Sequence, residues 1–158
     1  MSNAHQEGPA HTWQFVRNFV GSVENRLAIR DLLDSYADGI TRRDKDVWAS
    51  CWAREGHWKP DSIVLSGVDN IVTHWVDILK SSKGIKGSHN RLFLQSPGSI
   101  VISGDEGQGW AYTSELIVDD NNMTYHLNGM YSDRYVREDG RWVFPERVFR
   151  KLHIDRPY

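Results

Sequence analysis

Residues 123–154 read MTYHLNGMYSDRYVREDGRWVFPERVFRKLHI. The stretch holds two runs rich in aromatic and β-branched residues, joined by Asp139-Gly140, a dipeptide typical of hairpin turns. It therefore predicts two long antiparallel strands. Similar runs precede it at Ser88–Leu94, Ser99–Ile102 and Gly109–Val118. The sequence after Gly87 thus predicts one antiparallel meander.

The part of the chain before Gly87 predicts mainly helices. The exception is residues 57–65, which predict a strand pair or one broken strand, near a sheet edge because of Pro60. Ser22 begins the strongest helical pattern, whose apolar residues recur at helical spacing as far as Ile40. Weaker helical patterns cover residues 12–20, 45–52 with Asp44 as N-cap, and 67–80. Helices followed by strands indicate an α+β fold, in which N-terminal helices pack in a strongly curved antiparallel sheet and leave a mouth for a ligand.

Length and composition narrow the class of protein. A chain of 158 residues has room for one domain, and we expect an N-terminal extension over residues 1–21 and a single domain over residues 22–158. With 19 basic and 21 acidic residues, we expect no nucleic-acid partner. No apolar run approaches the roughly 20 residues of a membrane span, and the single cysteine forms no internal disulfide. We therefore expect a cytoplasmic protein without a membrane partner.

Aromatic residues are unusually frequent, with seven Trp, six Tyr and five Phe. Such an excess predicts a pocket for a flat apolar ligand or an aromatic subunit interface, and a core rich in Trp is the alternative. The histidines show no metal-ligand spacing, and no motif for a nucleophile or a dinucleotide is present. We expect neither a metal nor a cofactor.

Several segments resemble a known family in their order and spacing: Ala28–Leu33, the region of Tyr36, Asp46–Ala53 and, above all, Met130–Trp142. Together they resemble the SnoaL-like branch of the nuclear-transport-factor-2-like superfamily, nearest to the scytalone dehydratase and bile acid 7α-dehydratase type. The resemblance covers residues 22–154 and implies a cone-shaped α+β barrel of the cystatin-like class.

The resemblance also implies a function. It suggests a cofactor-free, dehydratase-like lyase or isomerase that does acid-base chemistry on a hydrophobic cyclic small molecule, such as a polyketide, a steroid or an aromatic metabolite. The same fold also serves non-catalytic proteins. The alternative is therefore a hydrophobic-ligand-binding protein or the small subunit of a ring-hydroxylating dioxygenase.

In the lyases of this family a histidine transfers the proton, and His89 is the matching residue. Those lyases pair the histidine with an aspartate, but Thr41 stands at the matching position here. Asp38 lies one helical turn earlier, so its carboxylate is a candidate substitute. A solvated helix face is the alternative for Asp38.

The resemblance makes Tyr36 and Glu115 further catalytic candidates. Tyr36 matches a pocket tyrosine, with core packing as its alternative role. Glu115 shares a strand face with Ala111 and Thr113. If that face lies inside, burial raises the pKa of Glu115, and otherwise Glu115 is an exposed surface residue. We expect four further residues to bind substrate: Thr41, Trp58, Tyr131 and Arg150. The resemblance implies the basic residue on the last strand, for which Lys151 is the alternative within one residue of register, and a charge at the rim is the alternative role.

The expected partners are the hydrophobic small molecule and further copies of the chain. The outer face of the predicted sheet carries aromatic and β-branched residues that need covering. We therefore predict a homodimer or a homotrimer.

Overall fold

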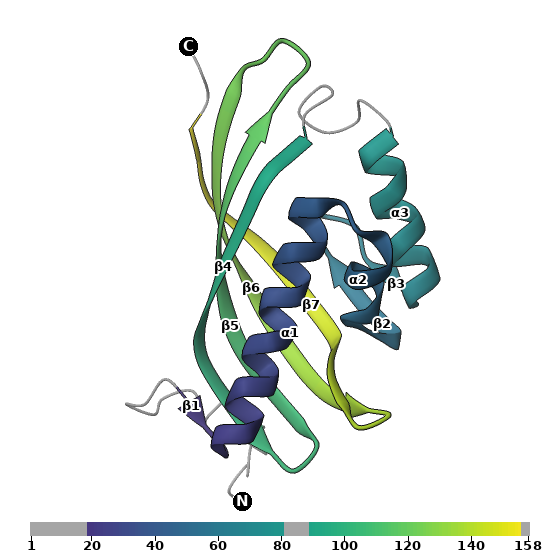
Figure 1. Cartoon of the computed structure of the whole chain (residues 1–158), viewed down its shortest axis with the longest axis vertical. Helices are drawn as coiled ribbons and strands as arrows, with labels where there is room; N and C mark the ends of the chain where they lie inside the picture. Colours follow the sequence, from purple (N-terminus) through teal and green to yellow (C-terminus); the bar gives the residue numbers. More distant parts are fainter. Residues whose placement is uncertain (1–18, 81–88, 156–158) are drawn as a thin grey trace, which may run out of the picture.

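The computed structural model describes residues 19–80 and 89–155. In these ranges one curved sheet carries three helices on one side (Figure 1). The elements in chain order are β1 (Phe19–Val20), α1 (Val23–Arg42), α2 (Lys45–Ser50), β2 (Trp52–Lys59), β3 (Leu65–Ser66), α3 (Val68–Lys80), β4 (His89–Ser103), β5 (Glu106–Val118), β6 (Thr124–Glu138) and β7 (Arg141–Asp155). The strand order is β1-β4-β5-β6-β7-β2-β3. The predicted α+β fold is confirmed.

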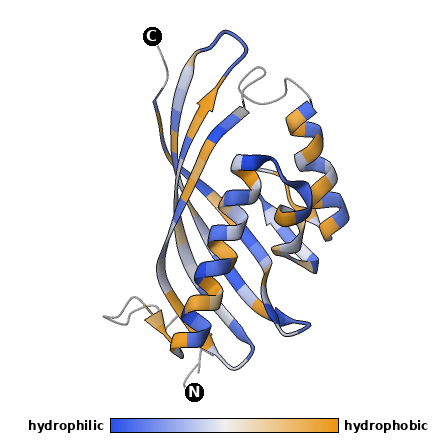
Figure 2. Cartoon of the chain, in the orientation of Figure 1, coloured by the Kyte–Doolittle hydropathy of each residue, from blue (hydrophilic) through white to orange (hydrophobic). Residues whose placement is uncertain are grey.

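Helix α1 is the main helix packed on the sheet. The Ser22 side chain caps it by accepting a hydrogen bond from the Asn25 backbone N–H at 3.1 Å. The helix runs through Thr41 and ends where Arg43 adopts a left-handed conformation. Hydrophobic and hydrophilic segments alternate along it (Figure 2). Its apolar stripe, with Tyr36 fully buried, is the face that packs inward.

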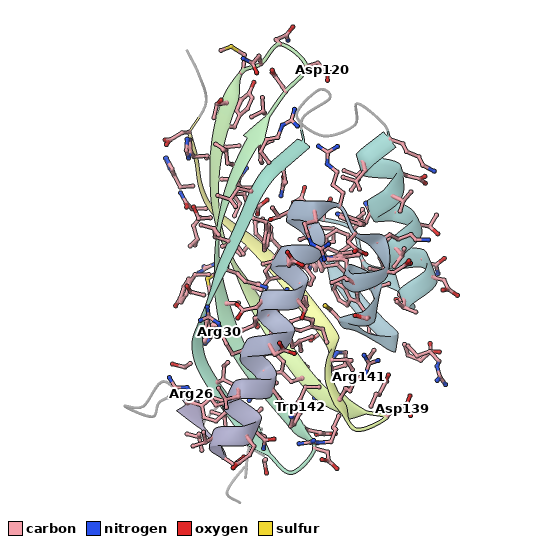
Figure 3. All side chains as sticks on the ribbon, in the orientation of Figure 1. Arg26, Arg30, Asp120, Asp139, Arg141 and Trp142 are labelled. Carbon is pink, nitrogen blue, oxygen red and sulfur yellow. The ribbon has the colours of Figure 1, made fainter. Side chains whose placement is uncertain are left out.

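The meander of β4 to β7 forms as predicted. The two runs expected from Ser88 to Ile102 join into the single strand β4, which has a register shift between Pro97 and Ile100. The turns on either side of β6 lie at opposite ends of the molecule, where Asp120 and Asp139 are labelled (Figure 3). The strands therefore span the full length of the domain.

Two expectations about the sheet need correction. Of the helix expected over residues 12–20, residues 12–18 lie outside the described residues. Phe19 and Val20 form a strand rather than a helix, and they pair in parallel with Ile100 and Val101 of β4. Strand β2 also pairs in parallel, with β7. The sheet is thus mixed and unclosed rather than a purely antiparallel barrel, with β1 beside β4 at one edge and β2 and β3 beyond β7 at the other.

Aromatic side chains fill the space between the helices and the sheet. The indole rings of Trp48 and Trp75 stack with centroids 4.6 Å apart, and the Trp48 ring also packs against Trp52 and Trp58. Five of the seven Trp residues belong to the buried core: Trp48, Trp52, Trp58, Trp75 and Trp142. Among the described helices, none is long and apolar enough to span a membrane.

Candidate functional site

A cavity of about 200 Å³ lies between helices α1 to α3 and the inner face of the sheet. Its wall is mainly aromatic and aliphatic. The lining residues are Tyr36, Ile40, Trp48, Trp58, Pro60, Trp75, Ile78, Leu79, Asn90, Phe93, Glu115, Leu127, Tyr131 and Phe149. A small apolar cavity with a few polar groups is typical of ligand-binding sites.

Among the described residues that line this cavity, Glu115 is the only one with an acidic or basic side chain, counting Asp, Glu, His, Lys and Arg. It lies on β5, on the buried face that it shares with Ala111 and Thr113, and its residue is 8% exposed. The Asn90 side-chain amide donates a hydrogen bond to Glu115 Oε2 at 2.7 Å. Burial raises the pKa of Glu115 to about 7, although the hydrogen bond from Asn90 opposes the shift. Near neutral pH, this carboxyl group can therefore either accept or donate a proton.

Two tyrosine hydroxyls lie in the same cavity. Tyr36 comes from α1 and Tyr131 from β6, and their hydroxyl oxygens are 3.4 Å apart. Burial raises the pKa of both phenols above the usual value, so both are neutral at pH 7. They can therefore act as hydrogen-bond donors to a ligand.

A buried ion pair supports the two tyrosines from behind. The Arg147 guanidinium lies 4.2 Å from the centre of the Tyr36 ring and 3.9 Å from that of Tyr131. It donates to both carboxylate oxygens of Asp133, at 2.8 and 2.9 Å, and to Gln95 at 3.2 Å. The Gln95 amide in turn donates to the Leu33 carbonyl. This network holds both phenols in place through contacts with their rings.

Four of the eight predicted site residues line the cavity: Tyr36, Trp58, Glu115 and Tyr131. His89 begins β4, with its backbone opposite Val118, and its side chain lies outside what the structure describes. The residue after it on β4, Asn90, contacts Glu115.

The other three predicted residues do not line the cavity. Asp38 lies two residues after Tyr36 on α1, so it is on the opposite face of the helix. There it forms an exposed ion pair with Arg42 at 2.8 Å. The Thr41 hydroxyl accepts a hydrogen bond from the Phe93 backbone N–H at 3.0 Å and so joins α1 to β4. Arg150 follows the inward Phe149, so it is exposed on the outer face, where it contacts Met130 Sδ.

Asn90, Trp48 and the pair of Asp133 and Arg147 were not predicted from the sequence. The sequence does hold a signal for the ion pair, because the position of the Asp139-Gly140 turn sets which residues of the two hairpin strands lie opposite each other. Counting outward from that turn places Asp133 opposite Arg147 to within one residue, and the structure pairs them. Over the described ranges, no three His, Cys, Asp or Glu residues form a group that could hold a metal ion.

A family model described as SnoaL-like domain matches residues 21–148. Hexachlorocyclohexane dehydrochlorinase LinA-type3 from Novosphingobium barchaimii LL02 is 21% identical with a TM-score of 0.64, covering 85% of this chain and 90% of that protein. A scytalone dehydratase-like protein from Novosphingobium aromaticivorans is 16% identical with a TM-score of 0.69, covering 85% and 89%.

A protein of unknown function with a cystatin-like fold, from Nostoc punctiforme, is 14% identical with a TM-score of 0.64, covering 84% of this chain and 95% of that one. The TM-scores establish a shared fold with these three proteins. No curated protein matches the chain.

Proposed function

Because the chain belongs to the SnoaL-like domain family, we propose that it is a cofactor-free lyase or isomerase that moves a proton on a hydrophobic cyclic small molecule. Two proteins of the same fold are named as a dehydrochlorinase and as dehydratase-like, and both names denote elimination reactions. An elimination needs a base that removes a proton from carbon.

The observation that carries the proposal is Glu115 in an apolar cavity. A general base works best when its pKa lies near the working pH, and burial raises the pKa of Glu115 to about 7. The carboxylate takes the proton from a substrate carbon. The resulting acid then returns the proton to another carbon, as in an isomerisation, or to a leaving group, as in an elimination.

The tyrosine pair supplies the second part of the chemistry. When a proton leaves a carbon next to a carbonyl group, negative charge develops on the oxygen. Neutral Tyr36 or Tyr131 can donate a hydrogen bond to that oxygen, and the Arg147 charge behind the rings favours such donation. The site thus combines a base with a hydrogen-bond donor.

The volume of the cavity limits the size of the substrates that fit. An apolar cavity of roughly 150 Å³ holds benzene, and drug-sized ligands need about 300 Å³ or more. At about 200 Å³, this cavity favours compounds with one or two rings over a four-ring steroid.

The proposal is tested with 1-indanone, a two-ring ketone whose α-protons exchange with solvent deuterium when a base removes them. Proton NMR should show that the protein accelerates exchange and that Glu115→Gln abolishes the acceleration. The matched control is Glu106→Gln, an exposed glutamate on the same strand, which should exchange at the wild-type rate.

Binding of 1-indanone without any exchange would overturn the proposal and favour the ligand-binding alternative. His89→Ala belongs in the same assay. A loss of exchange in that variant, with unchanged binding, would show that His89 shares the proton transfer with Glu115.

A further inference from the structure

Strand β4 is irregular where it forms part of the cavity wall. In its pairing with β5, Asn90 lies opposite Ile117. Leu92 lies opposite Leu116, so Arg91 is an extra residue in this pairing. Arg91 and Leu92 are both exposed, although neighbouring residues of a regular strand point to opposite faces. An extra residue, with two consecutive side chains on one face, forms a β-bulge.

The bulge determines which side chain of β4 reaches Glu115. Asn90 and Phe93 both line the cavity, yet residues three apart in a regular strand lie on opposite faces. Without the extra residue, Arg91 would point toward the cavity and Asn90 toward the outer face. Bulges are frequent next to active sites, where they redirect a side chain. Here the bulge places a neutral amide, instead of a charged guanidinium, beside Glu115.

A side-chain amide is suited to hold a carboxyl group that gains and loses a proton. The Asn90 amide Nδ2 donates to Glu115 Oε2 at 2.7 Å. The amide does not titrate, so the donor is present at every working pH. A neutral donor also stabilises the carboxylate less than a cation would, so burial still raises the pKa of Glu115. Because the donor comes from the neighbouring strand, the hydrogen bond restricts the rotation of the carboxyl group.

The other titratable groups around the cavity are neutral near pH 7. They are the phenols of Tyr36 on α1 and Tyr131 on β6, whose pKa values are raised by burial. The Thr113 side chain, on the same face of β5, also lowers the pKa of Glu115. The Arg147 charge lies behind the tyrosine rings. The described lining residues of α2, α3, β2, β4 and β7 include no acidic or basic side chain, so among the described lining residues Glu115 titrates alone in this pH range.

We infer that Asn90 is the positioning residue for Glu115: its amide holds the carboxylate in the orientation from which it takes the proton of the substrate. This inference rests on the proposed function and adds a second residue to it. Asn90 transfers no proton itself, because a side-chain amide does not titrate near neutral pH. Loss of the amide should change the protonation of Glu115 and also leave its carboxyl group free to rotate.

The first test follows the Glu115 carboxyl group without any substrate, by NMR of protein carrying ¹³C in its glutamate carboxyl groups. The signal that disappears in Glu115→Gln identifies the residue, and its wild-type midpoint should lie at about pH 7. Asn90→Leu keeps a side chain of similar size and removes the donor. It should raise the midpoint by about one to two pH units, the loss of one hydrogen bond to a charged group.

The matched control is Asn128→Leu, the same chemical change on the outer face of the sheet. Asn128 lies on β6 opposite the exposed Ser114, and its replacement should leave the Glu115 midpoint at the wild-type value. An unchanged or lowered midpoint in Asn90→Leu would overturn the inference.

Asn90→Asp keeps the shape of the side chain and tests the same contact if Asn90→Leu does not fold. It replaces the donor with a second carboxyl group, so the two carboxyl groups share one proton and lose their protons in two steps. The higher midpoint should lie about one pH unit or more above the wild-type value. A higher midpoint at or below the wild-type value would show that the two side chains are not in contact.

Exchange of the 1-indanone α-protons distinguishes positioning from a change in protonation alone. In Asn90→Leu, the midpoint of the rate should move with the NMR midpoint. The limiting rate above that midpoint should fall about tenfold, with KM within about twofold, because the base is present but no longer held. A full wild-type limiting rate above the raised midpoint would show that Asn90 does not position the base.

The outcomes separate the two proposals. If the wild-type protein catalyses no exchange, the proposed function fails, whatever the NMR titration shows. If the wild-type protein catalyses exchange through Glu115 and Asn90→Leu keeps the wild-type midpoint and rate, the inference about Asn90 fails alone.

Discussion

Glu115 is an acid placed where its charge is unfavourable. Its pKa rises from the usual 4.5 to about 7, chiefly because the carboxyl group is buried. A protein keeps such a group at a cost in stability, and groups of this kind cluster at functional sites. The shift therefore has a consequence that can be measured without any substrate.

Stability should fall as pH rises, because the unfolded state loses the Glu115 proton near pH 4.5 and the folded state only near pH 7. Below pH 4.5 the Glu115 carboxyl is protonated in both states, so its pKa shift does not change the free energy of unfolding. Above pH 7 the shift lowers the free energy of unfolding by its full amount, about 3 kcal/mol. Urea unfolding should show Glu115→Gln gaining that amount over wild type between pH 4.5 and 8. A constant difference across this range would contradict the shift, and Glu106→Gln serves as the control.

Asp133 carries the largest predicted effect on stability among the residues behind the site. Asp133→Asn leaves the fully buried Arg147 charge without its counter-charge, so we expect a loss of about 3–5 kcal/mol in urea unfolding. Asp105→Asn breaks an exposed pair with Arg137 and should cost less than about 1 kcal/mol. Similar losses in the two variants would show that the buried pair contributes no more than a surface pair.

At the scale of elements, periodicity and turn residues were sufficient to predict most of the fold. The Ser22 cap, the α1 stripe and the Asp139-Gly140 turn are local signals, and each element they predict is present. The parallel pairings of β1 with β4 and of β2 with β7 were not predicted, because a strand partner far along the chain leaves no local signal in the sequence.

The site was partly predictable, because local periodicity also indicates which side chains point inward. The alternation of residues along the strand was consistent with Glu115 pointing inward, and the spacing along the helix was consistent with Tyr36 pointing inward. Both residues are buried. Asp38 failed to reach the cavity because its helical phase points it to solvent. The contact between Asn90 and Glu115 depends on the register of β4 with its bulges, which the sequence does not display.

Helix α1 also contains a close contact that reverses a general rule. Replacing Gly by Ala inside a helix usually stabilises it by about 1 kcal/mol. A Cβ added at Gly39, however, would lie 3.0 Å from the backbone N of Trp48 in α2. We expect Gly39→Ala to destabilise the protein by about 1–3 kcal/mol in thermal or urea unfolding, because α2 must move.

The control is Ser35→Ala on the same helix, which improves helix propensity without such a contact and should change stability by no more than about 0.5 kcal/mol. Stabilisation by Gly39→Ala would show that α1 and α2 pack less tightly than described.

At the scale of the whole molecule, no helix or strand of residues 19–80 and 89–155 covers the outer face of the sheet. Leu92, Leu94 and Tyr112 point away from the helices and are 40%, 54% and 49% exposed. A formal net charge of −2 means that copies of the chain repel one another only weakly. We propose that this face joins copies of the chain into a homodimer or homotrimer.

Sedimentation velocity should therefore show a dimer or trimer at micromolar concentration, and Leu94→Glu should shift it toward monomer. Leu27→Glu changes a leucine on α1 that is 64% exposed and should leave the assembly intact. A wild-type monomer at high concentration would rule out this interface.

The proposed reaction depends on proton transfer by Glu115 inside the cavity. The most direct measurement is the pH dependence of 1-indanone α-proton exchange catalysed by the wild-type protein. A carboxylate base predicts a rate that rises with pH and levels off above a midpoint near 7, where burial places the pKa of Glu115. A midpoint near the ordinary glutamate value of 4.5, or a profile that persists unchanged in Glu115→Gln, would contradict it.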